Sequence, residues 1–218
     1  MADGLIFGPA PWQILMVGAK HSGKSQCIKY VCRAYASQFA CIVVFCPTAL
    51  NGFYSFIPKK YVHDDYDPEV MREILTKQED YKRAGKNVHV LCVFDDIIGS
   101  ETINFEKRQQ NELNRVFCAN RHYNLSVIVV TQSLKRVPRI LRDNVDGACI
   151  FRCMRQAYEG LYETFGHMDK KDFYKFLDEG SRDYQVILYK ANVSNPKDHF
   201  ACFKIPQFEI ARKFALLY

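Results

Sequence analysis

The sequence lacks the features that mark membrane, secreted and disulfide-stabilised proteins. Its best apolar run, Val127–Val130, is far shorter than the ~20 residues that a membrane-spanning helix needs. None of its nine cysteines forms a Cys-x-x-Cys pair, and the first residues carry Asp3 without the basic lead of a secretory signal. These absences predict reduced thiols, no membrane insertion and an intracellular location.

The sequence also lacks internal repeats, low-complexity tracts and Gly/Ser-rich linkers, so we expect one domain over residues 1–218. Its 48% hydrophobic and 25% charged residues are close to the average for globular chains, which excludes a disordered tail, a collagen-like fibre and a coiled coil.

Acidic residues are in the minority, with 30 Lys and Arg against 24 Asp and Glu, a net charge of +6. The segment Asn104–Arg155 holds ten basic and four acidic residues, so the whole excess can be assigned to this segment. A local basic excess suggests an acidic partner such as nucleic acid.

Apolar strands alternate with helix-like stretches along most of the chain. This alternation predicts an α/β protein whose mostly parallel sheet is covered on both faces, with a motif core over about 13–152. In the C-terminal extension, about 156–218, two apolar runs flank a turn and predict an antiparallel hairpin at one edge of the sheet. The expected strands are Gln13–Val17, Cys41–Phe45, Val88–Phe94, Ser126–Thr131, Ala148–Arg152, Tyr184–Tyr189 and Phe200–Ile205, and the expected helices are Lys24–Phe39, Pro68–Ala84 and Phe105–His122.

A glycine-rich turn after the first expected strand fits the phosphate-loop pattern G-x-x-x-x-G-K-[ST]. Glycines allow backbone N–H groups to point at phosphates, and the following helix adds the positive end of its dipole. In such a loop Lys24 neutralises the β- and γ-phosphates of ATP, and the Ser25 hydroxyl binds Mg²⁺. The predicted nucleotide-binding residues are Gly18, Ala19, Lys20, His21, Ser22, Gly23, Lys24 and Ser25.

Two carboxylates end the apolar strand Val88–Phe94. We expect this strand to neighbour the phosphate-loop strand and Asp95 to bind Mg²⁺, either directly or through water. Asp96 is then placed to orient or deprotonate the attacking water. The alternative is a polar pair that begins a surface loop, which is common at strand ends.

Gln132 follows the strand Ser126–Thr131, at the carboxyl edge where open α/β sheets bind ligands. We predict that it senses the γ-phosphate or holds the attacking water; the alternative is a residue that only caps the strand. Arg121, Arg139 and Arg142 flank this strand and are candidates for an arginine finger, often supplied by a neighbouring subunit, although each one alone could be a solvated surface residue. The predicted catalytic residues are Asp96, Gln132, Arg121 and Arg142.

The order of these motifs resembles that of viral genome-packaging ATPases, namely the poxvirus and giant-virus group of the FtsK–HerA superfamily. The resemblance covers about Gln13 to Arg152, with Asp95-Asp96 in place of the Asp-Glu found in much of the superfamily. It is carried by Gly18–Ser25, Val44–Thr48, Phe94–Asp96, Arg121-His122 before Val129–Gln132, and Val137–Arg139 followed by Arg142 and Asn144.

The resemblance implies a three-layer, RecA-like (ASCE) phosphate-loop NTPase fold that uses ATP and Mg²⁺. It implies a homo-oligomeric ring, a pentamer or hexamer, that hydrolyses ATP to move double-stranded DNA into a preformed capsid. Capsid or portal-type proteins would be further partners, and the place of action would be the host cytoplasm or nucleus, at the site of virus assembly. Our expected DNA-facing residues are Lys107, Arg108, Lys135 and Arg136.

Two other functions fit parts of the sequence. A nucleoside or nucleotide kinase has a similar length and an early phosphate loop, and Arg152–Arg155 could belong to its lid. Against a kinase stand the Asp-Asp and Thr-Gln strand ends, which it does not require. A non-catalytic assembly scaffold, which uses nucleotide only to set its conformation, is the other alternative.

Overall fold

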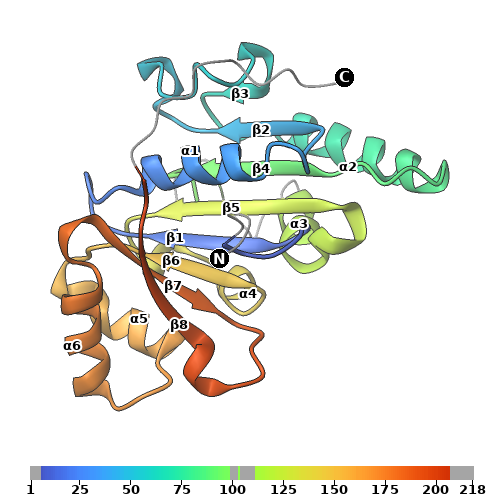
Figure 1. Cartoon of the computed structure of the whole chain (residues 1–218). Coiled ribbons are helices and arrows are strands. Elements are labelled where there is room, and N and C mark those ends of the chain that lie inside the picture. Colours follow the sequence, from blue (N-terminus) through green and yellow to red (C-terminus); the bar gives the residue numbers. More distant parts are fainter. Residues whose placement is uncertain (1–5, 99–102, 104–110, 207–218) are drawn as a thin grey trace.

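The computed structural model describes residues 6–98, 103 and 111–206, and within them eight strands form one sheet in the order β3-β2-β4-β5-β1-β6-β7-β8 (Figure 1). The strands from β3 to β6 in this order are parallel, whereas β7 is antiparallel to β6 and β8 is antiparallel to β7. The strands are β1 Gln13–Val17, β2 Cys41–Phe45, β3 Val62–His63, β4 Val90–Asp95, β5 Leu125–Thr131, β6 Gly147–Ile150, β7 Gln185–Lys190 and β8 Phe200–Lys204.

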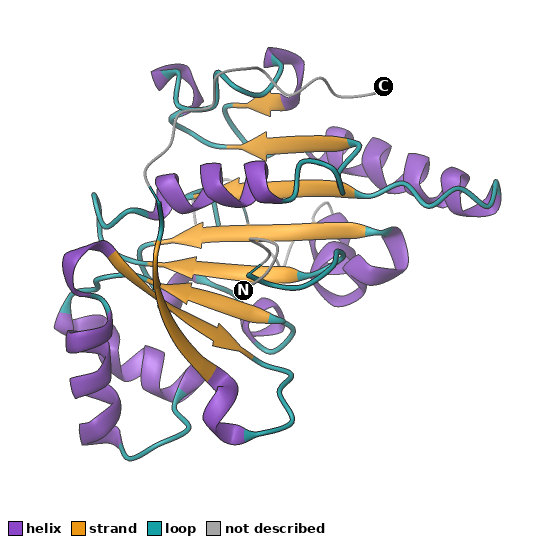
Figure 2. Ribbon diagram, in the orientation of Figure 1, coloured by secondary structure: helices purple, strands orange, loops and turns teal. Residues whose placement is uncertain are grey.

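Helices cover both faces of the sheet and give the three layers that we expected (Figure 2). Helix α1 packs on one face, and α2 to α6 pack on the other. The helices are α1 Lys24–Ala34, α2 Pro68–Arg83, α3 Asn111–Ala119, α4 Arg139–Arg142, α5 Tyr158–Phe165 and α6 Lys170–Gly180.

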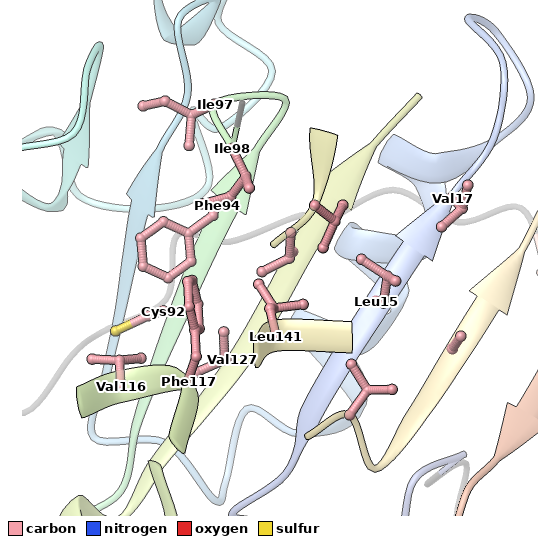
Figure 3. Packing of buried hydrophobic residues seen from close by; sticks show 14 of the residues in the cluster. Leu15, Val17, Cys92, Phe94, Ile97, Ile98, Val116, Phe117, Val127 and Leu141 are labelled. Carbon is pink, nitrogen blue, oxygen red and sulfur yellow. The ribbon is translucent and has the colours of Figure 1, made fainter. Parts of the chain in front are cut away.

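The core follows from the alternation of side chains along buried parallel strands. In β1, Leu15 and Val17 join the cluster under α2 to α6, and Ile14 and Met16 join the cluster under α1. Figure 3 shows the first cluster, in which Phe117 of α3 lies over β4. Its ring meets that of Phe94 with centroids 5.8 Å apart and an interplanar angle of 71°. Because these strands are buried on both faces, the core fixes the positions of the strand ends.

Some element boundaries differ from the prediction. Helix α1 ends at Ala34 instead of Phe39, where the chain turns and buries the Tyr35 ring against Trp12. The long polar helix expected to His122 gives way to a 3-10 turn over Asn120–Tyr123, and residues 104–110 of that prediction lie outside the described residues. Helices α5 and α6 were not predicted at all.

The C-terminal hairpin is confirmed, because β7 and β8 pair in antiparallel register beyond β6. The expectation that the carboxylate strand would neighbour the phosphate-loop strand is wrong, since β5 lies between β4 and β1. This insertion places the end of β5 between the phosphate loop and the carboxylates. In the described part of the chain, no helix has the length and apolarity required to cross a bilayer.

Candidate active site

The phosphate loop begins where β1 ends, and the neighbouring strand ends hold its backbone. The Gly18 N–H donates to the carbonyl oxygen of Thr131 at the end of β5, at 3.2 Å. The Ala19 N–H donates to the carbonyl oxygen of Arg152, just beyond β6, at 2.9 Å. The loop therefore has a fixed starting point on the strands at either side of β1.

Two glycines of the loop are required by the geometry. A Cβ on Gly18 would lie 2.6 Å from the Phe151 Cβ and 2.6 Å from the Ser22 Oγ, both closer than real Cβ contacts. Gly23 has φ 102° at the N-cap of α1, in the left-handed region that residues with a Cβ rarely adopt. Among the described contacts, the buried Ser22 Oγ has no hydrogen-bond partner. A glycine cradle with an unpartnered hydroxyl fits a loop that binds phosphate oxygens.

Lys24 folds back over the loop that contains it. Its ammonium donates to the carbonyl oxygens of Gly18 and Ala19, both at 2.7 Å. Burial lowers the pKa of Lys24, and the charges of Asp96 and Asp95 oppose this shift because they attract the ammonium. Lys24, Asp95 and Asp96 are thus close enough to interact, as the sequence predicts. Ser25, the predicted metal-binding hydroxyl, is exposed in the first turn of α1.

Asp95 is held by two residues that the sequence did not predict. The Tyr54 hydroxyl donates to its Oδ2 at 2.7 Å, and the Cys46 Sγ contacts the same oxygen at 3.6 Å. Burial raises the pKa of Asp95, and these two hydrogen bonds partly offset the rise because they stabilise the ionised form. Both contacts reach Oδ2, and Oδ1 accepts no hydrogen bond among the described contacts.

Tyr54 gave no sequence signal, because it lies 41 positions before Asp95 in a segment without regular spacing. It is almost fully buried, and its pKa is raised well above the usual value, chiefly by burial and then by the charge of Asp95. At any working pH the Tyr54 hydroxyl therefore keeps its proton and remains a donor.

Asp96 and Gln132 are brought together from different strands. The Gln132 Nε2 donates to the Asp96 Oδ2 at 2.6 Å. Asp96 has φ 55°, and its N–H donates to the carbonyl oxygen of Val130 at 3.0 Å, which ties the end of β4 to β5. The Thr131 hydroxyl exchanges two hydrogen bonds of 3.1 Å with the backbone of Ser133, and this turn presents Gln132. Two predicted catalytic residues are therefore in direct contact.

The candidate arginine fingers lie at the other edge of the sheet, where the parallel strands begin. Arg121 forms an ion pair with Asp146, whose Oδ2 accepts from the N–H of Gln13 at the start of β1. Arg142 lines a pocket of about 470 Å³ at the same edge, and its buried Nε has no partner among the described contacts. Arg139 is exposed and pairs with Asp143 at 3.1 Å. Within one chain, these arginines are not placed at the phosphate loop.

The basic segment is less available to an acidic partner than its charge suggests. Of its eight bases in the described part of the chain, four are in ion pairs: Arg115, Arg121, Arg139 and Arg155. Lys135 and Arg136 are exposed in the 3-10 turn that follows Gln132, and the expected positions Lys107 and Arg108 lie outside the described residues.

A mostly parallel sheet, a phosphate loop after β1 and carboxylates at the end of β4 define a phosphate-loop NTPase of the RecA-like (ASCE) class. The family model described as "Poxvirus A32 protein" matches residues 7–213, and the chain belongs to this family. The resemblance to viral genome-packaging ATPases is thereby confirmed.

Proteins that the chain resembles come from several viruses. Uncharacterized protein 088R of Invertebrate iridescent virus 3 is 29% identical over 87% of this chain and 73% of its own length. Uncharacterized protein 075L of Invertebrate iridescent virus 6 is 28% identical over 90% of this chain and 78% of its own length. Among solved structures, the genome packaging NTPase B204 of Sulfolobus turreted icosahedral virus 2, in complex with ATP-γS, superposes with a TM-score of 0.66. It is 16% identical over 89% of this chain and 98% of B204, which confirms the fold.

Proposed function

We propose that this protein is an ATP-hydrolysing motor that moves double-stranded viral DNA into a preformed capsid, as one subunit of a homo-oligomeric ring of five or six copies. The observation that carries the proposal is the contact between Gln132 and Asp96, which joins two strand ends beside Lys24. Membership of the A32 family and the name of B204 support genome packaging as the purpose of the hydrolysis. Capsid or portal-type proteins would be its partners at an intracellular site of virus assembly.

The residues divide the chemistry of hydrolysis among them. The loop N–H groups and Lys24 would bind the phosphates of ATP in place of the internal contacts that Lys24 makes here. Mg²⁺, bound by Ser25 and Asp95, would neutralise charge on the β- and γ-phosphates. Asp96 would accept the proton of the attacking water. Gln132 would orient that water. Because Gln132 contacts Asp96 and directly follows β5, it would also couple the presence of the γ-phosphate to the position of β5.

The arginines require a second subunit in this mechanism. Because Arg121 and Arg142 lie at the edge where the parallel strands begin, they could approach only the ATP of a neighbouring copy. A ring supplies that copy, and each guanidinium would then stabilise the transition-state charge in the active site of the neighbouring subunit. Lys135 and Arg136, which are exposed beside Gln132, are the described residues that we assign to the DNA backbone.

The test compares ATP turnover with and without duplex DNA. We expect DNA to stimulate turnover, and Asp96→Asn to bind ATP but turn it over at least about a hundredfold more slowly, the usual effect of losing a general base. Asp172→Asn on α6, an exposed carboxylate in a helix, is the matched control and should turn over normally. Normal turnover by Asp96→Asn would overturn the assignment of the base. Phosphate transfer to a nucleoside without stimulation by DNA would replace the motor with a kinase.

A further inference from the structure

The turn that enters β7 brings an aromatic ring to the phosphate loop. Because β7 runs antiparallel to β6, it begins at the edge where the parallel strands end. Tyr184 directly precedes β7, and its Cδ1 lies 3.8 Å from the position that a Cβ on Gly23 would occupy. Gly23 is the residue before Lys24 and the N-cap of α1. The Tyr184 ring is therefore next to the point where the loop becomes the helix.

The exposure of this ring is unusual for an aromatic side chain. Tyr184 is 69% exposed, and it is the one aromatic among the exposed large hydrophobic residues in the described part of the chain. The Phe151 ring lies 3.9 Å from the same Cβ position on Gly23, but it is buried. Two aromatic rings therefore lie close to Gly23: the buried ring of Phe151 and the solvent-facing ring of Tyr184. The burial of Phe151 is explained by packing, whereas the exposure of Tyr184 is not.

The backbone holds Tyr184 in this position against its local preference. Asp183 has φ 51° and Tyr184 has φ 60°, so two successive residues with side chains adopt the left-handed conformation. The turn is fixed on both sides: the Ser181 hydroxyl, which is buried, donates to the carbonyl oxygen of Leu177 at 2.7 Å, and β7 continues into the buried Val186. Local strain of this kind persists where the surrounding structure imposes it, commonly at ligand sites.

We infer that Tyr184 forms one wall of the nucleobase subsite and stacks on the base of the nucleotide whose phosphates occupy the loop. The inference rests on the proposed function, because it needs a nucleotide in that loop. A neutral ring offers little to phosphates, which the N–H groups and Lys24 bind, but it offers a flat apolar face to a base. Since stacking depends on ring area more than on hydrogen bonds, the preferred ligands are purine nucleoside triphosphates.

The test separates the base from the phosphates by comparing Mg²⁺-ATP with inorganic triphosphate. Calorimetry on the full chain would measure both affinities for the wild type, Tyr184→Ala and Tyr184→Phe. We expect Tyr184→Ala to bind ATP about tenfold more weakly and triphosphate unchanged, because only the stacking contact is lost. Tyr184→Phe keeps the ring and should bind both ligands as the wild type does. Met168→Ala, which truncates another exposed apolar side chain, is the control and should change neither affinity.

Each other outcome has a definite meaning. An equal loss of affinity for ATP and triphosphate in Tyr184→Ala would show that the ring only supports the loop, and would overturn the inference. Equal affinities of the wild type for the two ligands would also overturn it. If the wild type bound neither ligand, the proposed function would fail together with the inference. Should Tyr184→Ala not fold, Tyr184→Trp replaces it: stacking predicts ATP-dependent quenching of the new indole, and unchanged emission contradicts it.

Discussion

Two carboxylates that are adjacent in the sequence have different surroundings. Asp95 is largely buried, with its Oδ2 held by Tyr54 and Cys46, whereas Asp96 is exposed and held by Gln132. A pair of titratable groups whose environments differ in this way can take different chemical roles. The buried member suits a fixed metal ligand, and the exposed member suits a group that contacts the attacking water.

The hydroxyl of Tyr54 should set the pH at which Asp95 can bind metal. Tyr54→Phe removes a donor to the ionised carboxylate, so the pKa of Asp95 rises further. The metal-binding form exists above that pKa, and the acid limb of the pH profile for Mg²⁺-dependent turnover therefore shifts to higher pH. On that limb we expect about tenfold lower turnover than in the wild type. Tyr66→Phe is the control, because the buried Tyr66 hydroxyl has no hydrogen-bond partner among the described contacts. An unshifted limb in Tyr54→Phe would contradict the role of Asp95.

The ionised form of Asp95 should also destabilise the folded chain at neutral pH. Burial raises its pKa in the folded chain above the unfolded value, so the folded state disfavours ionisation. This cost is present above both pKa values and disappears as the pH falls below the unfolded pKa. Asp95→Asn should therefore unfold at a higher temperature than the wild type at pH 7, and the gain should vanish near pH 3. A lower unfolding temperature at pH 7 would show that the hydrogen bonds outweigh burial.

At the scale of elements, the ends of the strands build the site, and the sequence predicted these ends well. Apolar runs followed by polar residues located the ends of β1, β4 and β5 to within a residue. The sequence could not reveal the order of the strands, because pairing depends on contacts between distant segments. That order, with β5 between β4 and β1, is what lets Gln132 reach Asp96.

Other parts of the site and fold had no sequence signal. The contact of Tyr54 with Asp95 and the approach of Tyr184 to Gly23 arise from the paths of two loops, which spacing does not encode. Helices α5 and α6, by contrast, do carry apolar residues at helical spacing, with Tyr158, Leu161 and Phe165 in the first and Phe173 and Leu177 in the second, so a search for periodicity could have found both. In α1, the apolar pattern continues past Ala34 because Tyr35 and Phe39 pack in the core without being helical.

The phosphate loop should tolerate no side chain at its first glycine, for a steric reason. In Gly18→Ala the new Cβ meets the Phe151 Cβ at 2.6 Å, which a rotation of the Phe151 side chain cannot relieve. We expect a loss of more than about 2 kcal/mol in the free energy of unfolding, measured in urea without nucleotide. Gly52→Ala is the matched control: its φ is 72° and nothing lies within 4 Å, so it should lose only about 1 kcal/mol from strain. Equal losses of unfolding free energy in the two variants would mean that backbone conformation, and not packing, determines the cost at both glycines.

At the scale of the whole molecule, the charge has a different meaning from the one that composition suggests. Arginines of the basic segment pair with Glu79, Asp146, Asp143 and Asp178, so a net charge of +6 is not six free cations on one face. Exposed pairs of this kind contribute little to stability. The pairs of Arg121 and Arg139 hold their guanidinium groups at the edge opposite the phosphate loop, the position that the proposed ring requires, whereas Arg155 follows β6 on the phosphate-loop side.

Mixing two inactive variants should restore turnover if sites are shared between subunits. Lys24→Ala cannot bind ATP but keeps its arginines, and Arg142→Ala binds ATP but lacks one. At a 1:1 ratio, random mixing makes about a quarter of the interfaces complete, so about a quarter of wild-type turnover should return. The same experiment with Arg121→Ala identifies which arginine acts across the interface. Arg83→Ala, an exposed arginine on α2, should be fully active alone. No recovery in either mixture would count against a shared site.

The position of β5 also has a mechanical consequence for the proposed ring. The strand spans roughly 23 Å, is buried along its entire length and is paired with β4 on one side and β1 on the other. The turn that carries Arg121 precedes it, and Gln132 follows it. Since such a strand cannot slide without breaking both ladders, it moves only as a stiff body. Loss of the γ-phosphate near Gln132 would then displace Arg121 at the opposite end of the strand. In the proposed ring, this displacement would couple ATP hydrolysis in one subunit to the site of its neighbour, without a hinge.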